Sequence, residues 1–143
     1  MKIEILSREA MLEKLEKGLP PKTAVISFFD PSYVPFPINY EGKCDRFMQI
    51  GVYDLDIDTL AYYKLTFETF FKEAPALAAF IKKAAADGCD FLCQCEYGQG
   101  RSAGCAAAIL EYYEKNGISV FADYRYCPNK LIFNKLLAAL CEE

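Results

Sequence analysis

The chain has 143 residues, 53% of them hydrophobic and 25% charged, so it is long enough to bury one core and too apolar for a disordered segment. Its net charge is −4 and its cations are scattered, which argues against a nucleic-acid partner. It contains no histidine, which excludes mechanisms that need an imidazole base and argues against most zinc sites.

The cysteines and the apolar runs bear on where the protein resides. The seven cysteines are odd in number and are spaced unlike the disulfide framework of a secreted module, so we expect reduced thiols. No apolar run is long enough to span a membrane, and the first residues become charged and polar too soon for a secretory signal. We therefore expect a single domain over residues 1–143, in the cytoplasm and without a membrane segment.

The first half of the chain is predicted to combine strands with one helix. Residues 2–6 alternate polar and apolar side chains, as in a short edge strand. Ser7 is placed as the N-cap of a helix that ends at Gly18. Residues 23–29 and 47–53 are apolar runs rich in β-forming side chains, so we predict two further strands there.

Between those two strands, residues 30–45 contain several prolines and predict a long loop. Long loops in compact domains are commonly functional. The aromatic side chains of this loop have two interpretations: they form one wall of a ligand cleft, or they pack the loop onto the core. These side chains are Tyr33, Phe36 and Tyr40.

The second half is predicted to carry helices around one more strand. Thr66 can cap a helix that contains Phe67, Phe70 and Phe71, and Pro75 marks either a break or the first turn of a new helix. A helix over 76–87, ended by Gly88, is followed by a strand over 90–95. The next helix, over 101–116, ends at Gly117, and its inward-facing residues are Ala106, Ile109, Leu110 and Tyr113. The stretch over 118–127 is ambiguous, and a final helix runs from Pro128 to Leu140. Strands that alternate with helices predict an α/β fold with a central, largely parallel sheet flanked by helices.

The clearest chemistry lies in the loop after the strand at 90–95, which reads Cys95-Glu96-Tyr97-Gly98-Gln99-Gly100-Arg101 and is followed by Ser102. Backbone N–H groups of such a loop can surround a phosphate, and glycines let the backbone approach it closely. The helix N-terminus that follows favours negative charge, including the thiolate form of Cys95 that attacks phosphorus. Arg101 offers two parallel hydrogen bonds to phosphate oxygens, and Ser102 can donate to the sulfur when it leaves. The alternative is a buried structural cysteine beside an unrelated surface arginine.

This segment resembles the signature loop of protein tyrosine phosphatases, especially that of the small dual-specificity class. The family usually shows His-Cys-x-Ala-Gly-x-x-Arg-Ser, whereas this chain has Gln94 in place of the histidine that braces the loop and Tyr97 in place of a small residue. An amide can still donate a hydrogen bond, so we expect Gln94 to alter the acidity of the thiol rather than abolish the chemistry. Tyr97 is expected to narrow or reshape the mouth of the pocket.

The resemblance extends beyond the loop. Residues 76–95 are similar to the helix and strand that precede the loop in the family, and Tyr126-Cys127-Pro128-Asn129 before an apolar helix resembles small bacterial members. The likeness covers roughly the last two-thirds of the chain. The earlier residues match the family only in their order of strand, helix and strand.

The family also uses an aspartic acid on a separate loop, upstream of the cysteine, to protonate the leaving group. Asp56, which precedes an apolar residue after a strand, most resembles that residue, followed by Asp58 and then Asp54. Asp30, at the end of the preceding strand, is a further candidate from another loop. The alternative is an acidic turn that is simply solvated or caps the next helix.

Other cysteines lie near the loop in the sequence. Cys93 is two positions before Cys95 on the same strand face, so it is either a small buried hydrophobe or a partner for a reversible protective disulfide with the nucleophile. A metal cluster would need a different spacing from that of Cys89, Cys93, Cys95 and Cys105, so we expect no metal site.

The expected reaction is the two-step hydrolysis of a phosphomonoester through phospho-Cys95, with no metal or organic cofactor. The resemblance implies a phosphotyrosine or dual-specificity phosphoprotein substrate. One alternative is an inositol phosphate or another small phosphate, although polyanionic substrates usually require lysines in the loop and this loop offers Glu96 instead. The other alternative is a pseudophosphatase that binds phosphate without turnover.

Overall fold

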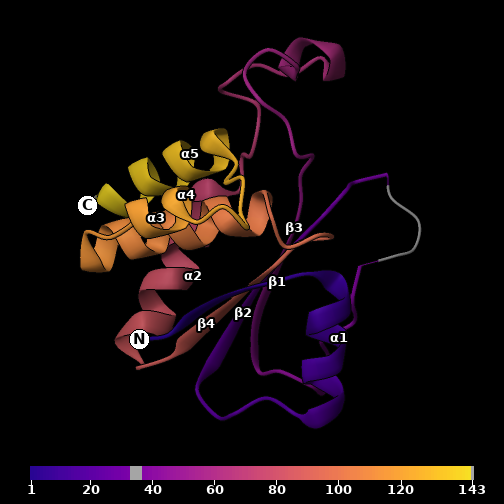
Figure 1. Ribbon diagram of the computed structural model, residues 1–143, viewed down its shortest axis with the longest axis vertical. Coiled ribbons are helices and arrows are strands. Elements are labelled where there is room, and N and C mark those ends of the chain that lie inside the picture. The colour runs from indigo at the N-terminus through magenta and orange to yellow at the C-terminus, as the bar shows by residue number, and fades with distance from the viewer. Residues whose placement is uncertain (33–36, 143) are drawn as a thin grey trace.

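Four parallel strands form the central sheet of the protein in a computed structural model that describes residues 1–32 and 37–142 (Figure 1). The strands run in the order β1-β4-β2-β3, so that β4 lies between β1 and β2. Their bounds are β1 Ile3–Leu6, β2 Thr23–Phe29, β3 Arg46–Gly51 and β4 Asp90–Gln94. The predicted parallel α/β architecture is confirmed.

Helices cover both faces of the sheet (Figure 1). Helix α1 (Arg8–Lys17) covers one face, where Met11 packs with Val25 of β2. The opposite face carries the larger core, because Ile26 and Phe28 of β2 point there and pack with three helices. Those helices are α2 (Ala74–Ala86), α3 (Arg101–Glu114) and α5 (Lys130–Cys141), and the short α4 (Ile118–Ala122) packs on α3.

The sequence signals for the first helix and for the strands are confirmed. Ser7 caps α1, since its side chain accepts a hydrogen bond from the backbone N–H of Ala10 at 3.1 Å. Gly18 ends the helix with a φ of +89°, a conformation that glycine adopts without a Cβ penalty. The predicted strand over 23–29 coincides with β2.

The segment before α2 differs from its prediction. The Thr66 hydroxyl does accept a hydrogen bond from the N–H of Thr69, as a capping residue would, but the chain forms only a turn there. Phe71, with a φ of +55°, adopts a left-handed conformation that no helix continues through. Phe70 and Phe71 leave the turn to enter the core, so burial overrides the local capping signal. A short 3₁₀ helix, η1 (Leu60–Tyr63), precedes this turn, and Pro75 lies in the first turn of α2.

The ends of the later helices also differ from their predictions. Helix α3 stops at Glu114 because Lys115 adopts a left-handed conformation with a φ of +54°, so Gly117 instead precedes α4. Tyr113, predicted to face inward, lies 37% exposed near the end of α3. The cap of α5 is Asn129 rather than Pro128, since the Asn129 side chain accepts from the N–H of Ile132 at 2.9 Å.

Residues 53–73 form an extension that projects beyond the layers of the domain, and we call it the arm (Figure 1). Its outer part exposes Ile57, Tyr62 and Tyr63. Lys135 of α5 donates hydrogen bonds to backbone carbonyls of Phe67 and Phe70, which ties the returning half of the arm to the domain.

Within the described part of the chain, no helix has the length and apolar character needed to cross a membrane.

Candidate active site

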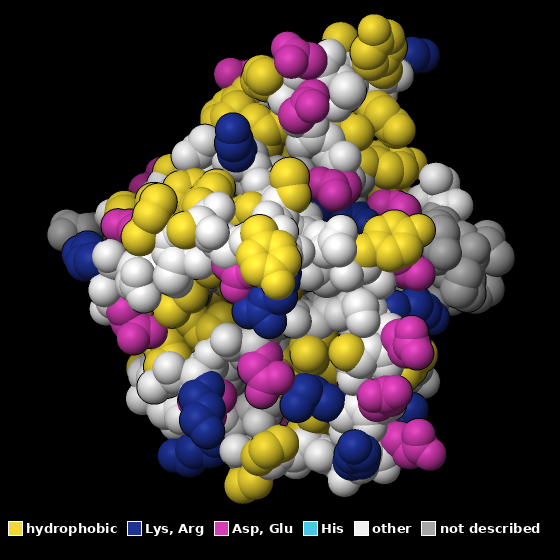
Figure 2. All heavy atoms as spheres, in the orientation of Figure 1, with side chains coloured by type: hydrophobic (Ala, Val, Ile, Leu, Met, Phe, Trp, Pro, Cys, Tyr) yellow, Lys and Arg dark blue, Asp and Glu magenta, His cyan; other side chains and the backbone are white. Residues whose placement is uncertain are grey.

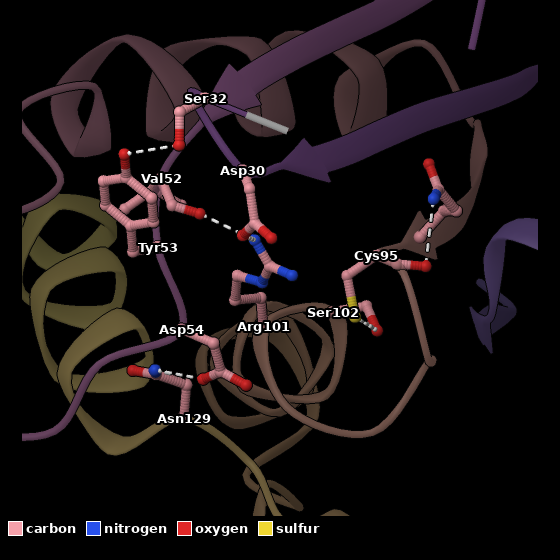
Figure 3. Close-up of polar contacts among 10 residues, drawn as sticks. Asp30, Ser32, Val52, Tyr53, Asp54, Cys95, Arg101, Ser102 and Asn129 are labelled. Carbon is pink, nitrogen blue, oxygen red and sulfur yellow. Dashed lines mark hydrogen bonds and ion pairs between the residues drawn. The ribbon is translucent and has the colours of Figure 1, made fainter. Parts of the chain in front are cut away.

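Polar side chains from three strands meet at one edge of the sheet. Because all four strands are parallel, their carboxyl ends lie at the same edge. Asp30 directly follows β2, Asp54 lies three residues after β3, and Cys95 directly follows β4. Figure 3 shows these residues around Arg101, which begins α3. This edge holds the predicted loop.

The first half of the loop packs against the end of β1. Gly98 has a φ of +68°, and a Cβ built on it would lie 2.6 Å from the backbone nitrogen of Ser7. The N–H of Arg8 also donates to the carbonyl of Glu96 at 3.0 Å. The glycine is therefore required both for its backbone conformation and for the close approach of two chain segments.

The second half of the loop is held by the segment before α5. The N–H of Cys127 donates to the carbonyl of Gln99 at 2.9 Å, and the N–H of Asn129 donates to that of Gly100 at 3.0 Å. Two carbonyls of the loop are thus fixed from outside it. The sequence resemblance pointed to residues 126–129 but not to this bracing.

The thiol of Cys95 lies 3.1 Å from the hydroxyl oxygen of Ser102 (Figure 3). Cys95 is 3% exposed and Ser102 is fully buried in the first turn of α3. The sulfur therefore lies at a helix N-terminus, beside a hydroxyl that can donate to it. This is the pairing that the sequence predicted for these two residues.

Gln94 braces the loop from behind. Its side-chain amide donates to the carbonyl of Cys95 at 2.9 Å, and its side-chain oxygen accepts from Tyr40 at 3.0 Å and from Ser27. The nitrogen and the oxygen of the amide are thus both engaged in hydrogen bonds. A glutamine therefore braces the loop at the position where the family has a histidine. Burial raises the pKa of Tyr40 to about 12.

The role of Tyr40 bears on the two interpretations of the proline-containing loop. Tyr40 is 1% exposed and packs with Met11 and Val25 in the core beneath α1, which is the packing interpretation. Tyr33 and Phe36 lie outside the described residues.

Arg101 is held from one side, while its Nε on the other meets no partner in the part of the chain that the structure describes. Its Nη1 donates to Asp30 Oδ1 at 2.5 Å and to the carbonyl of Val52 at 2.8 Å (Figure 3). The residue is 5% exposed, and its Nε is buried without a hydrogen-bond partner among the described residues. A buried N–H of a cation is costly to leave unpaired, so this atom indicates where an anion binds.

The three acidic candidates after β3 are placed differently. Asp54 lies against the loop, because a Cβ built on Gly100 would be 2.5 Å from Asp54 Oδ2. Its other oxygen accepts from the Asn129 side chain at 2.8 Å (Figure 3). Asp56 instead accepts from the N–H groups of Asp58 and Thr59, both at 3.0 Å, so its carboxylate closes its own turn. The structure thus brings Asp54 against the loop and engages the Asp56 carboxylate within its own turn.

Asp58 is exposed and its backbone N–H belongs to that same turn. Asp30 reaches the site, but as the ion-pair partner of Arg101.

Asn129 is a site residue that sequence reasoning missed. In the sequence it appears only within the family-like segment 126–129, and that resemblance does not reveal the contact with Asp54 across 75 positions.

The neighbouring cysteines form a packed pair. Cys93 Sγ lies 3.9 Å from Cys105 Sγ, and both residues are fully buried. Burial raises the pKa of the Cys105 thiol well above its usual value. Cys93 is therefore a buried core residue, while its disulfide with Cys95 stays a prediction. The described residues contain no group of three or more Cys, Asp or Glu side chains placed to hold a metal.

Comparison with known proteins rests on structure alone. No protein-family model matches the chain, and no curated protein matches its sequence significantly. The human tyrosine phosphatase-like serine/threonine/tyrosine-interacting protein has a TM-score of 0.60 and 15% identity, over 92% of this chain and 83% of that one. Tk-PTP in its active form has a TM-score of 0.61 and 14% identity, over 96% and 88%. Human DUSP28 has a TM-score of 0.58 and 16% identity, over 96% and 90%. The chain therefore has the fold of the tyrosine and dual-specificity phosphatases.

Proposed function

We propose that the protein is a cysteine-dependent phosphatase that hydrolyses phosphomonoesters through a phosphocysteine at Cys95. The observation that carries this proposal is the buried Nε of Arg101, which has no partner among the described residues, in a loop whose Cys95 thiol contacts Ser102 at 3.1 Å. A guanidinium with one free edge suits bidentate binding of phosphate oxygens. The proposed substrate is a phosphotyrosine or dual-specificity phosphoprotein, by resemblance of the loop.

In the first step, the Cys95 thiolate attacks phosphorus and the bond to the leaving oxygen breaks. Arg101 and the loop N–H groups stabilise the charge on the phosphoryl oxygens, which is greatest in the transition state. An acid must protonate the leaving oxygen as it departs. We infer that Asp54 is this acid, because its carboxyl group lies against Gly100 of the loop while that of Asp56 is engaged within its own turn.

In the second step, water attacks the phosphorus of phospho-Cys95, and the Asp54 carboxylate takes up the proton of that water. The P–S bond breaks and inorganic phosphate leaves. Ser102 donates a hydrogen bond to the departing sulfur, which stabilises the thiolate. Each group then returns to its starting protonation state, so no metal or organic cofactor enters the cycle.

The test is hydrolysis of p-nitrophenyl phosphate and phenyl phosphate between pH 5 and 8, with and without a chelator. Wild type should hydrolyse both, and Cys95→Ser should lose at least about 10³-fold because the nucleophile is gone. Asp54→Asn should lose on the order of 10²-fold on phenyl phosphate, whose leaving group needs a proton, and much less on p-nitrophenyl phosphate. Asp56→Asn, which removes a carboxylate from the next loop turn, should leave both rates within about twofold.

Different failures have different meanings in this experiment. Undiminished activity in Cys95→Ser, or activity that the chelator abolishes, would overturn the mechanism. A slow Asp56→Asn beside a normal Asp54→Asn would reverse the acid assignment alone. Wild type that binds phosphate but turns over neither ester would support the pseudophosphatase alternative. Preferred hydrolysis of inositol phosphates would support the other alternative, which the acidic residue Glu96 in the loop disfavours.

A further inference from the structure

A groove of about 480 Å³ opens beside the candidate active site. Its walls are helix α1 on one side and the loop residues Glu96 and Tyr97 on the other. Loop and helix are joined where they meet, since the N–H of Arg8 donates to the carbonyl of Glu96 at 3.0 Å. The groove therefore begins at the loop that holds Cys95 and follows α1 away from it.

The face of α1 that borders this groove is acidic. Glu9, Glu13 and Glu16 are spaced four and three residues apart, so they share one side of the helix. All three are exposed, and none forms an ion pair with any cation of the described chain. Acidic side chains gather over α1 in the space-filling view (Figure 2). Arg8 is the one Lys or Arg among the described residues that line the groove, so the groove carries net negative charge.

Exposed apolar side chains lie between these charges. Leu12 of α1 is 45% exposed and Tyr97 of the loop is 78% exposed, and both line the groove. Lys and Arg side chains combine a charged head with an apolar stem that packs on such surfaces. The face of an exposed tyrosine ring also attracts a cation. The chemistry of the groove is therefore complementary to basic side chains rather than to phosphates.

The position of the groove indicates what brings basic side chains to it. In the proposed function, a phosphoryl group is anchored at the loop by the buried guanidinium of Arg101, whose Nε has no partner among the described residues. A substrate peptide that extends from that phosphoryl group on one side would pass Tyr97 and reach α1. Glu9 to Glu16 span about 10 Å along the helix, which matches about three residues of an extended peptide.

We propose that this groove selects phosphorylated protein segments that carry Lys or Arg within a few residues of the phosphorylated side chain. The proposal rests on the proposed function for its phosphate anchor and adds the class of sequence around the phosphate. Glu13, at the middle of the acidic face, is the residue whose charge matters most for this selection.

The experiment measures binding to the Cys95→Ser protein by fluorescence anisotropy, so it does not require turnover. Three phosphotyrosine peptides of equal length carry Lys and Arg, Ala, or Glu around the phosphotyrosine, and an unphosphorylated basic peptide is the fourth probe. We expect the basic phosphopeptide to bind on the order of tenfold more tightly than the acidic one, with a difference that shrinks from 50 to 500 mM salt. Glu13→Lys in the same background should remove most of this preference.

Glu114→Lys is the matched control, because Glu114 is also an exposed helical glutamate but lies at the far end of α3 from the loop. It changes the net charge equally and should leave the preference intact. Equal affinities for all three phosphopeptides, or a preference that survives Glu13→Lys, would overturn the proposal. Tight binding of the unphosphorylated basic peptide would overturn the phosphate-anchored form of it.

Hydrolysis of p-nitrophenyl phosphate separates this proposal from the enzymatic one. That small ester does not reach α1, so Glu13→Lys should hydrolyse it at the wild-type rate. If wild type hydrolyses the ester but binds the peptides without preference, only the groove proposal fails. If basic phosphopeptides bind selectively while the ester is not hydrolysed, the groove proposal stands and the enzymatic one fails.

Discussion

Arg101 is held by the protein on one edge, and the proposed mechanism uses its other edge to bind phosphate. Its Nη1 is fixed by Asp30 and by the carbonyl of Val52, whereas its Nε has no partner among the described residues. The guanidinium is almost fully buried, so its position depends on the few groups that touch it. We therefore propose that Asp30 is a positioning residue, which acts on phosphate through Arg101 rather than by proton transfer.

The variant Asp30→Asn tests this role. It keeps the size of the side chain and one acceptor oxygen but removes the counterion of a buried cation, so we expect kcat/KM to fall about tenfold and inhibition by inorganic phosphate to weaken. The decline should be similar for p-nitrophenyl and phenyl phosphate, because the acid that protonates the leaving group is untouched. Asp45→Asn, at the opposite edge of the sheet, is the control. Tighter phosphate binding in Asp30→Asn would show instead that Asp30 competes with the ligand for Arg101.

At the scale of elements, the sequence predicted the parts whose signals are local. The strands β2 and β4 are short apolar runs. Helix α1 begins at the side-chain cap of Ser7 and ends at the positive-φ backbone of Gly18, and neither signal needs a tertiary partner. The turn at Thr66 had the same kind of local signal, but the burial of Phe70 and Phe71 and the contacts of Lys135 shape the chain there. Elements that depend on such distant contacts could not be predicted from their own residues.

The arm and α5 meet at the base of the arm, where the side chain of Asn129 has three hydrogen-bonding partners. Its side-chain nitrogen donates to Asp54 Oδ1 at 2.8 Å and to the carbonyl of Leu55 at 3.0 Å, while its oxygen caps α5. The first two contacts fix the start of the arm, and with it the carboxyl group of Asp54, beside the loop. Helix α5 therefore positions the proposed acid.

Asn129→Ser separates the capping role from the positioning role. Serine still caps a helix, so the free energy of unfolding should fall only by about 1–2 kcal/mol for the two other hydrogen bonds that are lost. Serine cannot reach Asp54 or Leu55 in the same way, so kcat should fall about tenfold on phenyl phosphate and much less on p-nitrophenyl phosphate. Equal losses on both esters, or a large loss of stability measured by urea unfolding, would indicate a structural role only. Asn134→Ser, an exposed position on the same helix, is the matched control.

At the scale of the molecule, the parallel sheet makes the site by bringing distant segments to one edge. The loop was predictable because its cysteine, glycines, arginine and serine are contiguous in the sequence. The choice among Asp54, Asp56 and Asp58 was not, because these residues alternate within one short segment and only their contacts with Gly100, Asn129 and Thr59 distinguish them. The side-chain partners of Gln94 come from β2 and Tyr40, and those of Arg101 are Asp30 after β2 and Val52 after β3. No spacing rule connects those segments to the loop.

The network behind the loop also couples global stability to pH through Tyr40. Burial raises the pKa of Tyr40 to about 12 from 10.0, so the folded state keeps the phenol protonated where the unfolded state loses its proton. The resulting stability is fully present below pH 10 and is lost as the pH rises toward 12, with a loss of about 1.4 kcal/mol by pH 11.

Tyr40→Phe keeps the ring but lacks the hydroxyl that donates to Gln94, so wild type should be more stable by about 1 kcal/mol at pH 8 in urea unfolding. That advantage should disappear by pH 11. Tyr124→Phe, at a residue 96% exposed, should differ from wild type equally at both pH values. An advantage over Tyr40→Phe that stays constant up to pH 11 would show that the Tyr40 hydroxyl is as free to ionise in the folded protein as in the unfolded chain.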